Sequence, residues 1–251
     1  MMKSTLRITM TVAILLAAWQ YLVPYADIPA YILPLPSEIW ARFLETFSLQ
    51  AYNLAVTAGT TLLGLCIGVL VGVLLALLVV YVKSAKSIIL PFLATFNGIP
   101  KIAIAPLLVI WFGLGPDSKI ILAFLLSLFP IFVHSLTGLN EIDDDILDLA
   151  RLAGGSNWQM FTKVRLMHAL PYITDALKVA FPLALVGSIV GEFIGGNVGI
   201  GYLVLSGQFN MDIALVFAAL LSITIFTSVG ISAIGLFERL FLKWQPSRRE
   251  R

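Results

Sequence analysis

The sequence predicts an all-α integral membrane protein with six transmembrane helices, and three observations lead to that prediction. Of the 251 residues, 59% are hydrophobic and only 12% are charged, and the mean hydropathy of +0.98 exceeds that of soluble domains. Six apolar runs, the shortest of 16 residues and the others of 21 to 29, approach or exceed the roughly 20 residues that a helix needs to cross a bilayer. Lysine and arginine gather between alternate runs.

The first apolar run covers residues 8–23 and follows Lys3 and Arg7. Such a run is either a cleaved signal peptide or a first transmembrane helix. We favour the helix, because the Pro-Tyr-Ala-Asp sequence at 24–27 lacks the small residues of a cleavage site.

A short helix at the membrane interface is predicted next. Pro29, Pro34 and Pro36 favour an extended connection, and Ser37 is placed to cap the helix that follows. An apolar side suits a helix lying in the interface. That side carries Ile39, Trp40, Phe43 and Phe47.

Glycine recurs at every fourth position in two later spans. Such ladders let helices approach closely in a bilayer, where no hydrophobic force drives packing, so we expect both spans inside the bundle. The ladders are Gly64, Gly68 and Gly72 in the second span (54–82), and Gly187, Gly191 and Gly195 in the fifth (170–196).

The other spans are predicted at 88–112, 119–139 and 213–240. Gly98 and Pro100 interrupt the first of these, so we expect a kink there. The domain organisation follows from the spans. Residues 1–52 hold the first helix and the interfacial segment, 53–240 form a transmembrane core that includes the polar loop 141–171, and 241–251 form a basic tail.

The positive-inside rule places both termini in the cytoplasm. If the N-terminus is inside, the segments on the outer side of the membrane hold only two basic residues, Arg42 and Lys119. The cytoplasmic segments then hold Lys3, Arg7, Lys83, Lys86, Arg151, Lys163, Arg165, Lys243, Arg248, Arg249 and Arg251.

The polar loop itself reads as two short helices. Asp143, Asp144 and Asp145 place negative charge at a helix N-terminus, and Gly154 and Gly155 end that helix. Its apolar residues at helical spacing are Ile146, Leu149, Ala150 and Ala153.

Ser156 and Gln159 form a capping box for a second helix, whose apolar stripe is Met160, Phe161 and Val164. Such a pair of helices outside the membrane is either a docking element for another protein or an ordinary interhelical loop, and the pattern alone does not separate the two.

Catalytic motifs are absent. The sequence has no phosphate loop, no histidine pair at metal spacing and no hydrolase triad on one side of the membrane. Cys66 is the single cysteine, which excludes a disulfide framework. The acidic trio 143–145 reads as a solvated helix start rather than a cation site. We therefore expect no enzyme, no metal site and no cofactor bound by this chain.

Charged residues within the spans are candidates for function, because burying a charge in lipid is costly. Glu192 has no local partner, so it lines a water-filled pathway or pairs with another helix. Lys101, after the Gly-Pro interruption, attracts an anion or extends toward the interface. Asp175 and Lys178 share a helical face and are expected to neutralise each other. His134 is expected to make a structural hydrogen bond.

The sequence resembles the permease subunits of binding-protein-dependent ABC importers, in the branch that imports nitrate, sulfonates and taurine. The family motif E-A-A-x3-G-x9-I-x-L-P corresponds here to Asp148-Leu149-Ala150, Gly154 and Val164-Arg165-Leu166-Met167. Asp, Leu and Met replace the motif's Glu, first Ala and Pro. Further resembling segments lie at 33–40, 106–115, 169–173 and 191–205.

This resemblance implies a type I importer permease in a prokaryotic inner membrane. Such a permease pairs with a second copy, expected here as a homodimer, receives a small solute from an extracytoplasmic binding protein, and binds a cytoplasmic ATPase dimer that uses ATP. The resemblance makes the polar loop the coupling element. Its residues are Asp148, Ala150, Gly154, Gly155, Ser156, Trp158 and Phe161.

A channel or scaffold without nucleotide coupling is the alternative function. Six spans and glycine ladders suit it equally, but the motif spacing does not. A membrane enzyme would need a nucleophile or metal cluster at one depth, and the sequence shows none.

Overall fold

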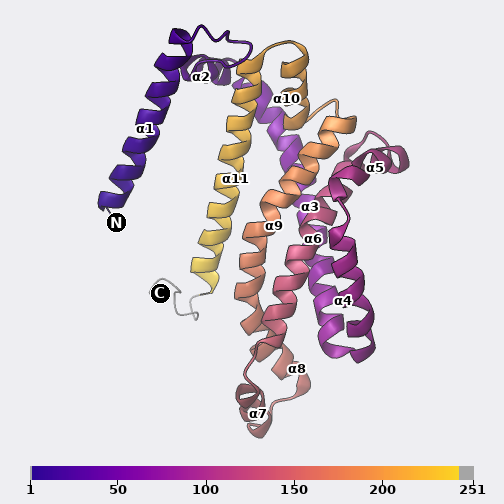
Figure 1. Cartoon of the computed structure of the whole chain (residues 1–251). Coiled ribbons are helices and arrows are strands. Elements are labelled where there is room, and N and C mark those ends of the chain that lie inside the picture. The colour runs from indigo at the N-terminus through magenta and orange to yellow at the C-terminus, as the bar shows by residue number, and fades with distance from the viewer. Residues whose placement is uncertain (1, 243–251) are drawn as a thin grey trace. The chain divides into compact units, whose positions relative to one another are not determined.

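The computed structural model describes residues 2–242, without the side chains of residues 2–6, 8 and 144. This range is built from helices (Figure 1). The basic tail from Lys243 lies outside the described residues. The helices are α1 Met2–Tyr25, α2 Pro36–Glu45, α3 Phe47–Tyr81, α4 Lys83–Gly98, η1 Lys101–Ile104, α5 Ala105–Phe112, α6 Pro116–Asn140, α7 Asp144–Leu152, α8 Asn157–Gln159, η2 Met160–Arg165, α9 Leu166–Gly195, α10 Ile200–Phe209 and α11 Ile213–Phe241.

In the described part of the chain, four helical segments are long and apolar enough to cross a membrane: Phe47–Tyr81, Pro116–Asn140, Asn157–Gly195 and Ile213–Phe241. The pair Lys83–Gly98 and Lys101–Phe112 makes a fifth if it counts as one span, although it is bent by 80°. The bend falls at the predicted Gly98–Pro100 interruption, where proline lacks the N–H that a continuous helix needs. The apolar part of α1, Thr9–Tyr25, is shorter, so the sixth span stays a prediction.

The chain divides into two compact units. The first consists of Met1–Val56 and Asn197–Ile225. Within it, Trp19 lies edge-on to Phe217 with ring centroids 5.8 Å apart, and the Ser222 hydroxyl donates to the buried Gln50 side chain. These contacts tie α1 and α3 to the start of α11.

The prediction that Ser37 caps the short helix α2 is wrong. The helix begins at Pro36, and the N–H of the preceding Leu35 donates to Glu38 Oε2 at 2.9 Å. Ser37 binds Gln20 of α1 instead, through its N–H at 3.1 Å and its hydroxyl at 3.0 Å. Proline at the first helical position sets the start, because its fixed φ suits a helix and its missing N–H costs nothing there.

The second unit consists of Thr57–Gly196 and Phe226–Arg251. Both glycine ladders lie in it and face α6, except Gly195, which faces Val109 of α5 and Leu114. A Cβ on Gly64 would lie 2.5 Å from the Cβ of Ala123, and one on Gly187 would lie 2.8 Å from the Cα of the same residue. Ala123 has no exposed surface. Helix α6 therefore runs between α3 and α9 at distances that only glycine permits.

Candidate functional site

The polar loop folds as the capping pattern predicts. Asp143 is the N-cap of α7, and its Oδ1 accepts the N–H of Asp145 at 3.1 Å. Gly154 follows the helix with a φ of +79°, and the N–H of Gly155 donates to Ala150 O at 3.1 Å. The positive φ is one that residues with a Cβ adopt only with strain, which explains glycine at this position.

The capping box of the second helix also forms. The Ser156 N–H donates to Gln159 Oε1 at 2.9 Å, and the Gln159 N–H donates to Ser156 Oγ at 3.3 Å. The three-residue α8 then passes into the π-helix η2, which continues directly into α9. No pattern in the sequence signals this π-helix.

One side of the loop packs on itself. Ile142, Leu147 and Met160 are buried together, with Ala150 and Val164 against them. The predicted apolar stripe of α7 is only partly right, because Leu147 is buried where Ile146 and Leu149 were expected.

Several other large apolar side chains of the loop are exposed, among charged ones. Leu149 is 69% exposed, Leu152 86% and Trp158 71%. The only described ion pair in the loop joins Arg151 to Asp148 at 2.7 Å, and both side chains are mainly exposed, so it adds little stability. The loop thus presents large apolar side chains that its own fold does not cover.

Glu192 lies inside the bundle near the end of α9. It has no exposed surface, and its Oε1 accepts the Thr57 hydroxyl of α3 at 2.7 Å. One turn away, the hydroxyls of Thr60 and Ser188 bind each other across the same two helices. Because a buried carboxylate without donors would be very costly, the Thr57 hydroxyl helps to hold Glu192 in the bundle.

Lys101 lies at the break between α4 and η1 and is only 8% exposed. Its Nζ donates to Asn97 Oδ1 at 2.9 Å and to Asn97 O at 3.3 Å, and it lies 5.7 Å from the centre of the Phe96 ring. Among the described residues, no carboxylate forms an ion pair with it. The ammonium therefore binds the carbonyl end of α4, where a helix dipole favours positive charge.

The predicted Asp175–Lys178 pair is present at 2.9 Å, and it has a third member. Lys178 also binds Glu238 of α11, within the same unit. His134 binds Pro130 O through Nδ1 at 2.9 Å, which is the structural hydrogen bond that we expected. Among the described side chains, no group of three or more His, Cys, Asp or Glu is placed to hold a metal ion.

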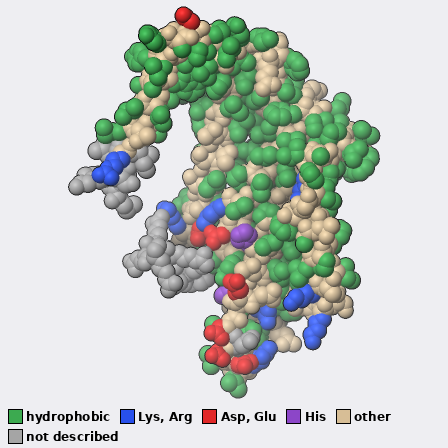
Figure 2. Space-filling view, in the orientation of Figure 1, with side chains coloured by type: hydrophobic (Ala, Val, Ile, Leu, Met, Phe, Trp, Pro, Cys, Tyr) green, Lys and Arg blue, Asp and Glu red, His purple; other side chains and the backbone are tan. Residues whose placement is uncertain are grey.

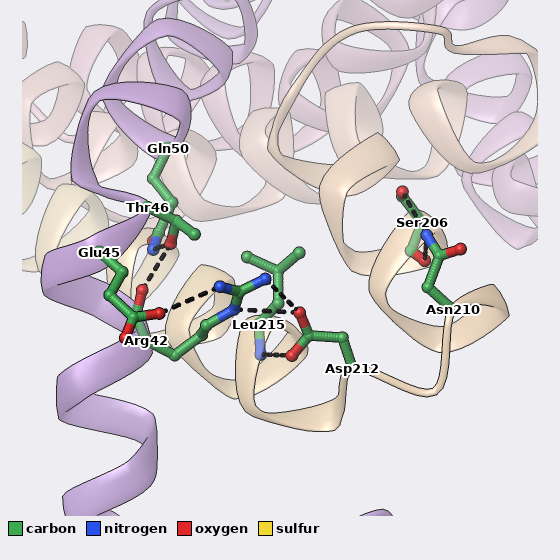
Figure 3. Close-up of polar contacts among 8 residues, drawn as sticks. All are labelled: Arg42, Glu45, Thr46, Gln50, Ser206, Asn210, Asp212 and Leu215. Atoms are coloured by element: carbon green, nitrogen blue, oxygen red, sulfur yellow. Dashed lines mark hydrogen bonds and ion pairs between the residues drawn. The ribbon is translucent and has the colours of Figure 1, made fainter.

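A further ion pair, which sequence reasoning missed, fixes the turn between α10 and α11 (Figure 3). Arg42 of α2 donates to Asp212 Oδ2 from Nε at 3.0 Å and from Nη2 at 2.6 Å, and to Glu45 at 3.1 Å. Asp212 Oδ1 also accepts the N–H of Leu215, so it caps α11. The hydrogen bond to Asp212 is the main cause that raises the pKa of Arg42 above its usual value.

Comparison with known proteins identifies what these helices belong to. Residues 68–244 match the family described as binding-protein-dependent transport system inner membrane components. The chain belongs to this family. The matched range contains the polar loop and both glycine ladders except Gly64.

Individual relatives agree with this membership. The chain is 37% identical over 210 residues to a probable ABC transporter permease protein of Haemophilus influenzae, covering 84% of this chain and 86% of the relative. It is 31% identical over 245 residues to the riboflavin transport system permease protein of Chloroflexus aurantiacus (96% and 91%). It is 28% identical over 237 residues to a putative aliphatic sulfonates transport permease protein of Bacillus subtilis (94% and 86%).

A solved structure shares the fold. The inward-facing methionine ABC transporter MetNI superposes with a TM-score of 0.67 at 19% identity, covering 78% of this chain and 97% of that one. The prediction of an ABC importer permease is therefore confirmed. As a member of this family, the chain is a multi-pass inner-membrane permease subunit and not an enzyme, and permeases of this kind work with an ATPase and a binding protein.

Proposed function

We propose that two copies of this permease form the pathway for a small organic solute, and that the loop from Asp143 to Phe161 couples the pathway to the ATPase. Closure of the ATPase dimer around ATP would move both loops together and turn the spans from inward-facing to outward-facing. ATP would be bound by the partner subunit, and this chain would bind no cofactor.

One observation carries this proposal, namely the exposed apolar side chains of the loop. Leu149 and Leu152 lie on the polar segment that joins the candidate spans Pro116–Asn140 and Asn157–Gly195, and Trp158 is the second residue of the latter span. Apolar and aromatic side chains exposed in such a place mark a protein interface, and buried tryptophan commonly dominates the affinity of such interfaces.

Co-purification tests the coupling. The ATPase encoded with this permease should remain bound during purification in detergent, and Trp158→Ala should weaken its retention by about tenfold or more, as loss of an interface anchor does. Trp111→Ala is the matched control, because Trp111 is 65% exposed on α5. Equal retention in the two variants would refute the coupling assignment.

The proposed orientation places six spans with both termini in the cytoplasm, as the charge distribution favours. In a Cys66→Ser background, a single cysteine at Ser156 should react with an impermeant thiol reagent from the cytoplasmic side only, and one at Asn210 from the outside only. Labelling of position 156 from outside would overturn both the orientation and the docking argument.

The solute is proposed as a small organic compound. The relatives named for riboflavin and for aliphatic sulfonates have similar identities of 31% and 28%, so we assign selectivity mainly to the binding protein. Calorimetric titration of that binding protein with riboflavin, taurine and alkanesulfonates would identify the class.

Glu192 and Lys101 stay our candidates for the pathway. Glu192 is closed off by Thr57 in this conformation, so a pathway role requires the bundle to open there. We predict that Glu192→Gln, which keeps size but removes charge, lowers transport without loss of assembled protein. Reduced assembly would instead assign Glu192 to bundle stability, and normal transport with normal assembly would contradict both roles.

A further inference from the structure

An apolar groove runs along the end of α3 in the second unit. One hollow of about 370 Å³ lies between α3 and the coupling loop, and a second of about 390 Å³ extends along α3. Because Leu77 and Tyr81 line both, the two hollows form one surface, which we call the Tyr81 groove. Its main walls are Leu74, Leu77, Leu78 and Tyr81 of α3, with Trp158 and Phe161 of the loop.

Aromatic contacts hold the two walls together. The rings of Tyr81 and Phe161 lie edge to face with centroids 6.1 Å apart, and Trp158 lies 5.8 Å from Phe161. Leu74 and Leu78 remain about half exposed. The groove is therefore preformed by packing, and apolar side chains line it along α3.

One cation, Arg165, contacts the end of the groove at Tyr81, and Lys83 and Lys163 lie near that end in the sequence. The Arg165 guanidinium lies 5.7 Å from the centre of the Tyr81 ring and donates one N–H to Leu139 O at 3.2 Å. Lys83 begins α4 two residues after Tyr81, and Lys163 follows Phe161 by two residues; both are exposed. Figure 2 shows Lys and Arg side chains gathered where α4 and α8 lie.

These cations are not neutralised within the described part of the chain. Among its side chains, none forms an ion pair with Arg165, Lys83 or Lys163. A guanidinium has five N–H donors in a planar fork that suits a phosphate. Arg165 uses one of them on Leu139 O, so donors remain for a ligand at the groove.

We propose that the Tyr81 groove binds an anionic phospholipid, with an acyl chain along Leu74 and Leu78 and the phosphate at Arg165, Lys83 and Lys163. Helix α3 is a candidate membrane span, so its exposed leucines meet hydrocarbon rather than a soluble partner. Basic pockets beside transmembrane helices recognise anionic headgroups in this way. The proposed orientation decides only that this lipid would belong to the cytoplasmic leaflet. The lipid site itself does not depend on the orientation.

Native mass spectrometry of the purified full chain, with and without its ATPase, tests the site. The probes are dioleoylphosphatidylglycerol and dioleoylphosphatidylcholine at matched concentrations. The parent protein should retain the phosphatidylglycerol preferentially. Each positive charge removed should weaken phosphatidylglycerol binding about fivefold. The double variant Lys83→Gln/Arg165→Gln should therefore bind this lipid more weakly than Lys83→Gln does.

Two further variants keep the test decisive. Leu78→Trp narrows the groove and should reduce retention of both lipids, whereas Arg239→Gln removes an exposed cation of α11 away from the groove and should change neither. Lys83 makes no described side-chain hydrogen bond, so Lys83→Gln should fold normally. If the double variant fails to fold, lipid binding is measured on Lys83→Gln alone.

Three results would overturn the lipid site. These are equal retention of the two lipids by the parent protein, an equal loss in Arg239→Gln, or variants that release the ATPase but leave lipid binding intact. The last result would assign the groove to the ATPase interface. Since lipid is measured on the permease alone as well, failure of ATPase coupling would not imitate failure of the lipid site.

Discussion

Two turns between helices in this permease are held in opposite ways. The coupling loop between α7 and α8 closes on bonds among its own neighbours, such as the Ser156–Gln159 box, and on the small cluster around Leu147. The turn between α10 and α11 is pinned by Arg42, 170 residues away in the chain, through Asp212. The coupling loop also touches α3 through the Phe161–Tyr81 ring contact, which is apolar and not an ion pair. We therefore expect the loop to keep its internal shape and to shift more readily than a turn that an ion pair pins. That difference suits the coupling loop to transmit motion.

Breaking the local closure should have the largest effect. Gly154 has a φ of +79° and nothing within 4 Å of where its Cβ would lie, so Gly154→Val strains the backbone without a steric clash. Strain of about 1–3 kcal/mol would shift the loop out of its docked geometry by about 5-fold to 150-fold. We expect intact membrane insertion but weaker ATPase retention, or hydrolysis uncoupled from uptake in proteoliposomes.

Gly235→Val is the matched control for that variant. A Cβ added to Gly235 of α11 would also have nothing within 4 Å, but this glycine lies within a helix and its φ is not positive. Parental uptake per ATP in Gly154→Val, or an equal defect in both variants, would make the loop a passive connection.

Removing the Arg42–Asp212 ion pair should have the second-largest effect. Asp212→Ala loses both its ion pair and the cap of α11, together about 1–3 kcal/mol, whereas Arg42→Gln keeps the cap and loses the partly exposed pairs with Asp212 and Glu45, about 1 kcal/mol or less. Apparent melting temperatures of the purified variants should fall in that order. Equal shifts would mean that the cap contributes nothing measurable.

The same pair should resist alkali. The raised pKa of Arg42 means that its contribution is present below the pKa of the unfolded chain and is lost only as the pH rises through the still higher folded value. That window is strongly alkaline, so the stability difference between parent and Arg42→Gln should not shrink between about pH 7 and about pH 9.

The smallest effect is expected at the capping box. Ser156→Ala removes the acceptor for the Gln159 N–H and should cost about 1 kcal/mol, or up to about fivefold in ATPase retention. Ser156→Asp supplies another capping oxygen and should restore the parental value. If Ser156→Ala and Ser156→Asp retain the ATPase equally well, the capping box does not shape the docked loop.

The sequence could predict the local features because their partners are neighbours. The cap at Asp143, the glycine end of α7 and the Ser156–Gln159 box each join residues a few positions apart, and the Gly-Pro interruption marks the break of the third span. Which side of α7 is buried was harder to predict. Ile146 and Leu147 are both apolar and adjacent, so moving the apolar stripe by one residue buries Leu147 in place of Ile146.

Contacts across long separations could not be predicted. Glu192 binds Thr57, Lys178 binds Glu238 and Arg42 binds Asp212, at separations of 135, 60 and 170 residues. The sequence shows which charged groups need a partner, but it does not show which spans lie close enough to supply one. The 80° bend and the π-helix likewise depend on how the spans pack.

Helices α8, η2 and α9 form one uninterrupted rod from Asn157 to Gly195, 39 residues or about 58 Å long. Trp158 stands near one end of this rod and Glu192 near the other. No loop lies between them, but Pro171 and Pro182 lie inside α9, so a tilt at the tryptophan end reaches Glu192 through two positions where the helix can bend. The π-helix η2 begins two residues after Trp158, and such segments within α-helices are frequent at functional sites.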